Sequence, residues 1–422
     1  MKKINLALEK EFPALKSRFG GRKLVYLDSA CTALKMRSSA AAHEAFLLER
    51  GFCGGKRSAH LPAAAVEEAF FEARRTVARF IGAARAEEII FTAGTTDAFN
   101  LFLSSFPFEG SRKEVIISPL EHNAVFLPLL NMSKQGRIRL RVIPLKNWAP
   151  DFAAYRKLLS RKTALVCLNR ASNIFGGLTD SAPFARLAKA SGAKVFLDVA
   201  QYLPTHAENV RSAGADACAF SGHKLGAPFG TGALYVERSL MERLVHSKAG
   251  GGTVREVSRT PGGFRVEYLN GYQGFEPGVQ NYAGAVALAK AADILVHAGL
   301  PAIRERVADL VTYGLKRLLP LKAVRVEGDV SRLHLGSIIP LVPAAPWFSA
   351  ADFNLYLNHG LKNMVVALRT GRHCSDLAAL SSGANDVIRL SFFAYSRRAD
   401  IDAFASAVEA YLAASGRQRG AG

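Results

Sequence analysis

One lysine in this sequence stands where a lysine can do chemistry. Lys224 lies in SGHKLGAPFG, residues 221–230, directly after the apolar run ADACAFS and before a turn rich in Gly and Pro. Lysines usually lie on solvated surfaces, but a lysine at the end of a buried strand loses its water. Desolvation lowers the pKa of the amine and makes it a nucleophile that forms Schiff bases with carbonyl compounds.

A lysine of this kind fits pyridoxal phosphate, whose ring withdraws electrons best when its nitrogen is protonated and paired with a carboxylate. Asp198 ends the apolar run KVFLDVA, at the carboxyl end of a predicted strand, where α/β sheets bind ligands. An aspartate there could also cap a turn, but a buried strand seldom ends in an unpaired carboxylate. We therefore predict that Asp198 is the partner of the ring nitrogen.

The phosphate of such a cofactor needs hydrogen-bond donors, which the first turn of a helix supplies. GTTDAFNLF, residues 94–102, predicts a helix that follows a glycine and begins with Thr95 and Thr96. Threonine is also a common N-cap, so this motif is weak by itself. Ser221 and His223 in the lysine loop would add two contacts.

Two more residues follow predicted strands. His122, in PLEHNAV after the run KEVIISP, is placed to cover the flat face of the ring, although a lone histidine is more often structural. Cys374 ends RTGRHC, residues 369–374, as either a core residue beside a turn or a reactive thiolate. Cations lower the pKa of a thiol, and Arg372 and His373 place positive charge beside it in the sequence.

The elements that must position these residues alternate between helix and strand. Apolar residues recur at helical spacing over residues 66–80, and short apolar runs follow at 87–94, 113–119, 163–169, 194–200 and 215–221. Continuous apolar strands between helices predict a mostly parallel sheet that helices cover on both faces. The run GTGALYV, residues 230–236, adds a strand that could break the parallel order.

The 422-residue length favours two domains. Residues 250–278 are rich in Gly and predict a long loop, which in a compact protein is usually functional. Beyond it, mixed helices and strands predict a smaller α+β unit. We expect an α/β fold with a large domain over residues 22–285, a small α+β domain over 286–415 joined by an N-terminal helix within 1–21, and a flexible tail over 416–422.

The composition, 49% hydrophobic and 21% charged, is that of an ordinary globular protein. Five dispersed cysteines without a CxxC pair argue against a disulfide framework or a zinc cluster. No apolar run is long enough to cross a membrane, and MKKINLALEKEF indicates an amphipathic helix and no signal peptide, so we expect a cytoplasmic protein without a membrane partner. The net charge is +20, but its dispersion favours a basic solvated surface over nucleic-acid binding and leaves an acidic protein partner open.

The motifs together resemble the class V branch of the fold-type I pyridoxal phosphate enzymes, and within it the group II cysteine desulfurases, which include selenocysteine lyases. The resemblance runs from YLDSACTA near residue 26 to the last helix. The lysine motif, placed after DVAQ, is its most specific part. The other motifs are AGTTDAFN, LEHNA, SNIFGG, GFEPG and RTGRHC.

The resemblance implies a role for each residue. Lys224 would bind pyridoxal 5'-phosphate as a Schiff base and move protons, Cys374 would take the substrate sulfur as a persulfide, and His122 would complete the catalytic set. The cofactor would also be held by Thr95, Thr96, Asp198, Gln201, Ser221 and His223. The substrate would be bound by Asn173, Arg369, His60 and Arg389, whose planar guanidinium suits the α-carboxylate.

The resemblance also implies partners. The substrate would be L-cysteine or L-selenocysteine, and a sulfur-acceptor protein would take the sulfur from the enzyme. The enzyme would be a symmetric homodimer with residues 250–280 at its interface.

The sequence departs from the family pattern at Arg372, where a histidine is usual, and at Val279, where a threonine after EPG reaches the neighbouring subunit's phosphate. Cys31 replaces a small residue. Two alternatives therefore stay open. One is a related class V enzyme, such as a carbon–sulfur lyase, an epimerase or an aminotransferase-like enzyme, that does not use Cys374 as acceptor. The other is a non-enzymatic scaffold or sulfur carrier, against which the intact lysine loop argues.

Overall fold

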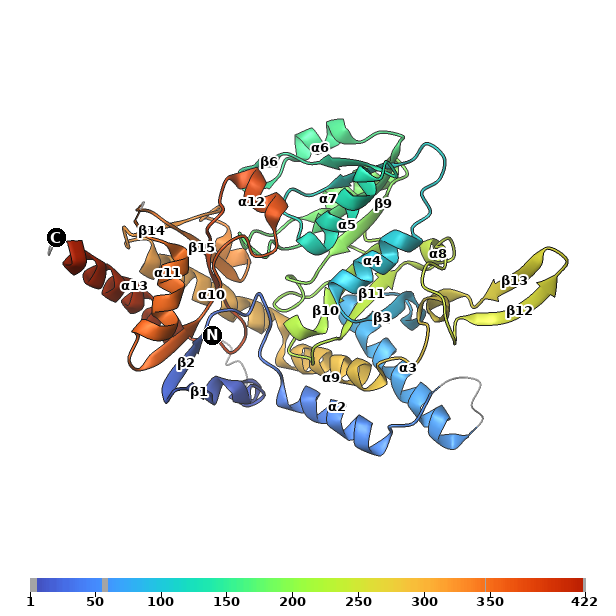
Figure 1. Cartoon of the computed structure of the whole chain (residues 1–422), viewed down its shortest axis with the longest axis horizontal. Helices are drawn as coiled ribbons and strands as arrows, with labels where there is room; N and C mark the ends of the chain where they lie inside the picture. Colours follow the sequence, from blue (N-terminus) through green and yellow to red (C-terminus); the bar gives the residue numbers. More distant parts are fainter. Residues whose placement is uncertain (1–5, 55–59, 346, 420–422) are drawn as a thin grey trace.

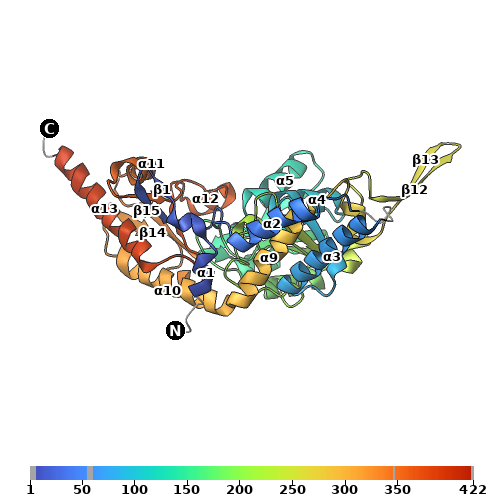
Figure 2. The same cartoon turned by 90° about the horizontal axis from the view of Figure 1, so that it is seen from below.

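The structure is a computed structural model that describes residues 6–54, 60–345 and 347–419. The molecule is elongated, with a lobe around a large sheet and a second lobe that holds both ends of the described chain (Figure 1). A two-stranded arm projects from the far side of the large lobe, as the view from below also shows (Figure 2).

The large lobe is built on a seven-stranded sheet with the order β3-β11-β10-β9-β8-β4-β5. Neighbouring strands are parallel except β11, which is antiparallel to both β10 and β3. The predicted parallel sheet and the strand that breaks it are thus confirmed. The strands are β3 (Ile89–Thr92), β4 (Glu114–Ile117), β5 (Arg139–Val142), β8 (Thr163–Asn169), β9 (Lys194–Asp198), β10 (Ala217–Ser221) and β11 (Gly232–Val236).

Helices cover both faces of this sheet because its strands are apolar on both sides. Along β8, Leu165 and Cys167 pack in one buried cluster and Val166 and Leu168 in another. The first cluster contains residues of α4 (Thr95–Ser105) and α5 (Asn123–Lys134), and the second residues of α3 (Leu61–Ile81), α7 (Ser181–Ala190) and α9 (Tyr282–Ala298). The remaining elements here are α2 (Arg37–Glu49), α6 (Phe152–Leu158), α8 (Arg238–Met241), β6 (Leu145–Lys146) and β7 (Ala149–Pro150).

The small lobe contains two three-stranded sheets, with the orders β14-β15-β17 and β1-β2-β16. Its strands are β1 (Arg18–Phe19), β2 (Arg22–Tyr26), β14 (Val324–Val326), β15 (Ile338–Pro343), β16 (Met364–Ala367) and β17 (Ile388–Ser391). Its helices are α1 (Leu6–Lys10), α10 (Leu300–Leu318), α11 (Ala350–Leu355), α12 (Asp376–Ser382) and α13 (Arg398–Arg419).

The domain boundaries differ from the prediction at both ends. Strand β2 pairs in parallel with β16, so residues 22–26 join the small lobe's sheet instead of beginning the large domain. Helix α9 packs Ala285 and Ala289 against Phe70 and Ala73 of α3, so it stays with the large lobe beyond residue 285. Helix α13 continues to Arg419, so residues 416–419 of the predicted tail are helical, and residues 420–422 lie outside the described part of the chain.

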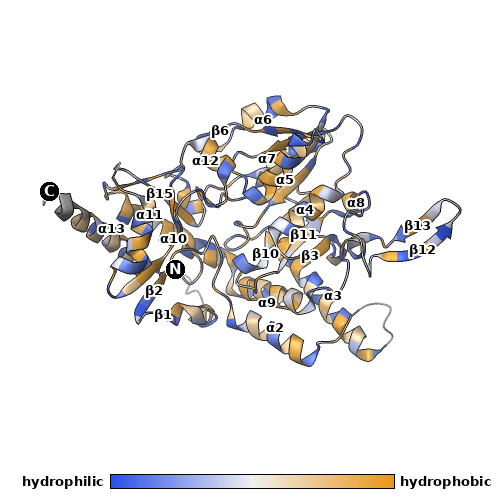
Figure 3. Cartoon of the chain, in the orientation of Figure 1, coloured by the Kyte–Doolittle hydropathy of each residue, from blue (hydrophilic) through white to orange (hydrophobic). Residues whose placement is uncertain are grey.

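The predicted long loop is instead mostly a hairpin. Strands β12 (Val254–Thr260) and β13 (Gly263–Tyr268) pair antiparallel and form the projecting arm. Both faces of the arm are exposed, and it mixes polar and apolar residues (Figure 3). The glycines on both sides of the hairpin obscured the two short alternating runs, VREVSRT and GFRVEY.

Among the described residues, no single helix has the length and apolar character to cross a membrane. The helices α9 and α10 reach that threshold only as a pair, with a bend of 76° between them.

Candidate active site

The predicted lysine and aspartate meet at the carboxyl ends of neighbouring strands. Lys224 ends a short 3-10 helix that follows β10, and Asp198 is the last residue of β9, paired in register with Ala219 of β10. Burial lowers the pKa of Lys224 and raises that of Asp198, and the charge of each opposes the shift of the other. The amine is therefore easier to deprotonate than an exposed lysine, as its predicted role requires.

The predicted phosphate site lies at the start of α4. The Ser221 hydroxyl accepts a hydrogen bond from the Thr95 backbone N–H at 2.8 Å and lies 2.8 Å from Thr95 Oγ1. Gly94 precedes the helix at φ 152°, and a Cβ at that position would lie only 3.1 Å from Ser221 Oγ. The N-cap residue, Gly94, has no side chain to cap this helix, and Thr96 in its first turn is exposed. The start of α4 thus lies against Ser221, the first residue of the lysine loop.

His223 supports the same interpretation. Its Nδ1 is buried and has no hydrogen-bond partner among the described residues. Burial, reinforced by the charges of Lys224 and Lys35, lowers the pKa of His223 to about 4, so the ring is neutral near pH 7. A ring nitrogen without a partner, close to the start of α4 and next to a desolvated lysine, fits pyridoxal phosphate, because the cofactor's phosphate would supply the missing partner.

His122 is the N-cap of α5, where its Nδ1 accepts from the Ala124 N–H at 3.0 Å. Burial, followed by the charges of Lys224 and Arg389, lowers the pKa of His122 to about 3. The imidazole is therefore neutral and its Nε2 carries the hydrogen. A neutral flat ring suits the predicted place against the cofactor.

Glu121 is a site residue that sequence reasoning missed. Its side chain is fully buried, and neither carboxylate oxygen has a hydrogen-bond partner among the described residues. Burial, with the charge of Asp198, raises its pKa well above the ordinary 4.5. The only signal in the sequence was its position inside the LEHNA motif. Its residue type gave none, because a glutamate between a turn and a helix is normally solvated.

Asp28 is the second missed residue. It joins two arginines of the predicted substrate site, since Asp28 Oδ1 accepts from Arg389 Nη2 at 2.9 Å and Asp28 Oδ2 from Arg369 Nε at 3.2 Å. Arg389 is buried in β17, whereas the Arg369 side chain is 52% exposed. The sequence offered the aspartate within YLDSACTA, but nothing in it shows that residues so far apart share one ion-pair network.

The loop that carries Cys374 is held in an unusual backbone conformation. Cys374 is exposed, and His373 and Cys374 have φ values of 53° and 55°, in the left-handed region that non-glycine residues rarely adopt. The Cys374 carbonyl accepts from the Asn123 N–H at 2.8 Å, so the loop is tied to the residue after His122. Cys374 also lies close enough to Lys224 for its charge to affect that amine.

Asn173 anchors this loop from a second side. Its Nδ2 donates to the His373 carbonyl at 2.8 Å, its Oδ1 accepts from Ser375 Oγ at 2.6 Å, and its carbonyl accepts from Arg389 Nη1 at 2.8 Å. The residue predicted to bind substrate therefore also connects the thiol loop to the predicted carboxylate clamp.

The charge predicted beside the thiol needs correction. His373 donates Nε2–H to the Val387 carbonyl at 2.8 Å, and burial together with the Arg389 charge lowers its pKa to about 3. A neutral His373 supplies no positive charge near pH 7. Arg372 is exposed, with Asp376 Oδ1 3.4 Å from its Nη1.

Two predicted residues have other contacts. Gln201 Nε2 donates to the Ala30 carbonyl at 2.5 Å, so the segment that contains Cys31 is bound to the loop that follows β9. His60 is exposed, caps α3 and accepts from Ala63 N–H at 3.1 Å. Among the described residues His60 makes no hydrogen bond with Lys224, and its position at the start of α3 leaves its predicted substrate role a prediction.

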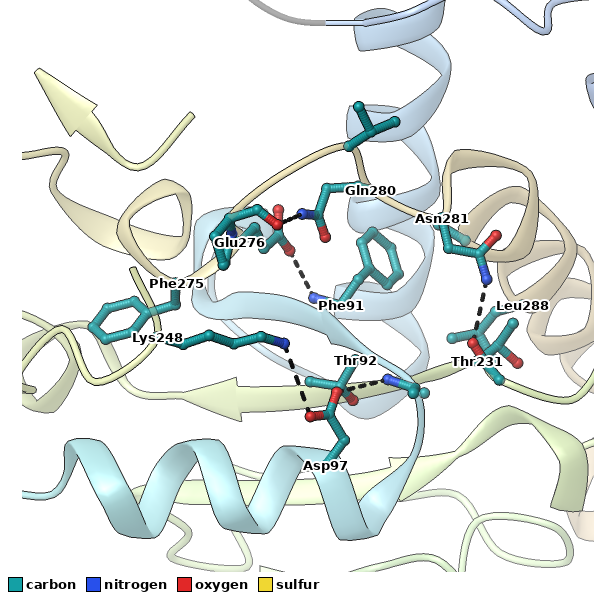
Figure 4. A pocket seen from close by; sticks show the side chains of 16 residues that line it. Phe91, Thr92, Asp97, Thr231, Lys248, Phe275, Glu276, Gln280, Asn281 and Leu288 are labelled. Carbon is teal, nitrogen blue, oxygen red and sulfur yellow. Dashed lines mark hydrogen bonds and ion pairs between the residues drawn. The ribbon is translucent and has the colours of Figure 1, made fainter. Parts of the chain in front are cut away.

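A pocket of about 240 Å³ adjoins the start of α4 on the side of the EPG motif (Figure 4). Glu276 accepts from the Phe91 N–H at 2.7 Å and pairs with the buried Arg74 at 2.7 Å, which fixes the motif to β3 and α3. Lys248 Nζ lies 4.0 Å from Asp97 across the pocket. Val279 lines the rim and is 74% exposed, so the position of the expected threonine faces outward.

Known proteins resemble this chain over nearly its whole length. The family model described as aminotransferase class-V matches residues 25–404. A cysteine desulfurase of Dickeya dadantii (strain 3937) is 33% identical over 401 residues, covering 93% of both proteins. A probable cysteine desulfurase of Borreliella burgdorferi is 30% identical over 405 residues, covering 94% of both.

Solved structures agree. The cysteine desulfurase CsdA of Escherichia coli superimposes with a TM-score of 0.83 at 28% identity, covering 96% of this chain and 98% of CsdA. The apo cysteine desulfurase of Thermococcus onnurineus NA1 has the same fold, with a TM-score of 0.86 at 24% identity over 98% of this chain and 99% of its own. The fold predicted from the sequence is confirmed.

Proposed function

The chain belongs to the aminotransferase class-V family, and we propose that it is a pyridoxal phosphate-dependent cysteine desulfurase. In this reaction L-cysteine becomes L-alanine and its sulfur passes to Cys374 as a persulfide. Members of the family use pyridoxal phosphate, and the residues at the ends of β9 and β10 and at the start of α4 fit it.

One observation carries the proposal. The only thiol in RTGRHC is exposed on a left-handed turn whose carbonyl is tied to Asn123, next to His122. A non-glycine residue in this region costs on the order of 1–3 kcal/mol and persists only where the surroundings hold it. Here the bonds from Asn123 and Asn173 hold it, so the thiol stands on a fixed backbone, near enough to Lys224 to influence its pKa.

The chain's residues divide the work. Lys224, Asp198, Gln201, His122, Thr95, Thr96, Ser221 and His223 would hold the cofactor, which when bound supplies an electron sink for the substrate α-carbon. Lys224 then accepts and returns protons, because its lowered pKa lets it exist as the free amine. Arg389, supported by Asn173 and Asp28, binds the α-carboxylate.

Cys374 performs the sulfur transfer. Its thiolate forms a bond to the substrate sulfur while the carbon–sulfur bond of the substrate breaks. The carbon fragment keeps the electron pair, takes up a proton and leaves as L-alanine, so the products are one alanine and one persulfide. No external oxidant is needed.

The test is to incubate the holoenzyme with L-cysteine and a reducing thiol and to measure L-alanine and sulfide. Wild type should form both in equal amounts. Cys374→Ala should lose sulfide formation while keeping the visible absorbance of the bound cofactor. Lys224→Ala should lose both sulfide formation and that absorbance. Cys53→Ala is the matched control, since Cys53 is the other exposed thiol among the described residues. Full activity in Cys374→Ala would favour the related class V enzyme that does not use this thiol.

We further propose a cytoplasmic homodimer that passes its sulfur to an acceptor protein. The hairpin supports the dimer: Val257 pairs across the strands with Val266, and Phe264 lies two residues from Val266 on the same face. These side chains are 55%, 42% and 74% exposed. An apolar face on a projecting arm is typical of a contact with another chain, and in a symmetric pair each copy would cover the other's.

A further inference from the structure

Three chain segments that are distant in sequence meet at Asp28. The Arg389 N–H donates to the Arg369 carbonyl at 3.0 Å, and the Ser391 N–H donates to the Leu27 carbonyl at 2.8 Å. Asp28 therefore lies beside β17 and opposite the residue that begins RTGRHC. Its carboxylate, with a side chain that is 14% exposed, reaches both guanidinium groups.

Each oxygen of this carboxylate serves a different arginine. Oδ1 accepts from Arg389 Nη2 at 2.9 Å and Oδ2 accepts from Arg369 Nε at 3.2 Å. The Arg389 guanidinium is fixed at its other end by the Asn173 carbonyl, 2.8 Å from Nη1. Two contacts on different nitrogens set the orientation of the guanidinium plane.

Donors remain that the described residues do not use. Arg389 Nε has no hydrogen-bond partner among the described residues, and the side chain is only 3% exposed. A buried charged donor without a partner is costly unless a ligand completes it. The cluster also holds two positive charges against one negative charge, so it can accept one more carboxylate.

We propose that Asp28 is a positioning residue that holds Arg369 and Arg389 as one pair, so that both guanidinium groups recognise the α-carboxylate of an amino-acid substrate. The inference deepens the proposed function and rests on it only in taking an α-amino acid as the ligand. A purely structural ion pair would stabilise the lobe contact without distinguishing ligands that carry a carboxylate from ligands that lack one.

The test uses two probes of the holoenzyme that differ by this group. L-alanine carries the α-carboxylate, and cysteamine is L-cysteine without it. Binding of each is followed by the visible absorbance of the bound cofactor. Asp28→Asn should weaken L-alanine binding by about tenfold or more, because the two guanidinium groups lose their common anchor, and cysteamine binding by less than about twofold.

The control is Asp309→Asn, which removes an aspartate from an exposed pair between α10 and α13. Within the described chain that pair makes no hydrogen bond or ion pair with Asp28, Arg369 or Arg389, so the control should change neither affinity. Equal changes for both probes, or no change for either, in a folded Asp28→Asn enzyme with full cofactor content would overturn the proposal.

A second variant covers the case in which Asp28→Asn does not fold. Asp28→Glu keeps the charge but lengthens the side chain, so it should fold and displace both guanidinium groups. It should weaken L-alanine binding severalfold and leave cysteamine binding unchanged, whereas wild-type binding of both would contradict the inference. An enzyme that binds L-alanine in this way but forms no sulfide from L-cysteine would refute the proposed function and leave this inference standing.

Discussion

Burial sets the protonation of the side chains around Lys224. The same loss of water lowers the pKa of Lys224, keeps His122, His223 and His373 neutral, and raises the pKa of Glu121. Near pH 7 the site therefore contains a deprotonatable amine among neutral rings. A free amine beside uncharged rings can accept and return a proton at the substrate carbon.

Glu121 gives a residue-scale prediction about stability. Because its pKa is raised on folding, the folded state keeps the proton that the unfolded state releases, and this contribution to stability is lost as the pH rises from the ordinary 4.5 through the folded pKa. Glu121→Gln removes the titration and keeps the shape. Thermal unfolding should show the variant gaining stability relative to wild type as the pH is raised from 4 to 7.

Glu88→Gln is a control that removes a buried glutamate whose carboxylate accepts hydrogen bonds from the backbone N–H groups of Ala84 and Arg85. It should lose stability at every pH. A constant difference between Glu121→Gln and wild type across this pH range would show that Glu121 does not hold its proton on folding.

The roles of single residues were predictable where the sequence joined them to a strand end. Lys224, Asp198 and His122 follow apolar runs directly, and parallel strands bring their carboxyl ends to one edge. Asp28 and Glu121 could not be identified this way, because their importance comes from burial and from partners that the fold supplies. The charge state of His373 was predicted wrongly for the same reason, because the sequence shows a histidine but not its partial burial or its neighbour Arg389.

At the scale of elements, the thiol loop depends on its two asparagine anchors. Asn123 belongs to α5 of the large lobe, and Asn173 lies in the loop after β8, while Cys374 lies between β16 and α12 of the small lobe. The loop that carries the thiol therefore belongs to the small lobe but is hydrogen-bonded to the large lobe. These two hydrogen bonds fix the position of Cys374, where the sulfur would be received.

Asn173→Ala tests this docking. The change removes the bonds to the His373 carbonyl and to Ser375 Oγ in a buried place, which should cost about 1–3 kcal/mol of unfolding free energy. A displaced thiol should also lower kcat by about tenfold or more. The two effects are measured by chemical denaturation and by alanine formation at saturating L-cysteine.

Ser375→Ala removes only one of those two bonds and should give a smaller loss of both quantities. Iodoacetamide should alkylate Cys374 faster in Asn173→Ala than in wild type. Unchanged kcat and unchanged alkylation would mean that the loop does not need this anchor.

The prediction of helices and strands failed where strands pair over a long distance in the sequence, and where an alternating run is only a few residues long. The sheet of the large lobe was predictable from apolar runs, but the pairing of β2 with β16 joins opposite ends of the sequence. No local pattern reports such a partner. The β12–β13 hairpin was taken for a loop because glycines surround it and neither face is buried, so its alternation carried little weight.

At the scale of the whole molecule, the projecting hairpin and the outward Val279 place apolar side chains on the surface of the large lobe. The +20 net charge does not prevent a contact between two copies at this surface, because salt screens dispersed surface charges.

The dimer prediction is checked by light scattering after size-exclusion chromatography. Wild type should show twice the 45.5 kDa mass of the chain. Replacing Val257 and Phe264 with lysine should shift the mass toward one chain, since charge in an apolar contact is costly. Leu319→Lys, at an exposed apolar position outside the hairpin, should remain dimeric. A monomeric wild type would contradict the proposal.

The central claim is that Cys374 receives the sulfur of L-cysteine, and mass spectrometry of the peptide that contains it tests this most directly. After one turnover without a reducing thiol, the account predicts one additional sulfur atom on Cys374, in the same amount as the L-alanine formed, and none in Lys224→Ala. Alanine formed without added sulfur on Cys374, or sulfur found on Cys31 or Cys53 instead, would contradict it.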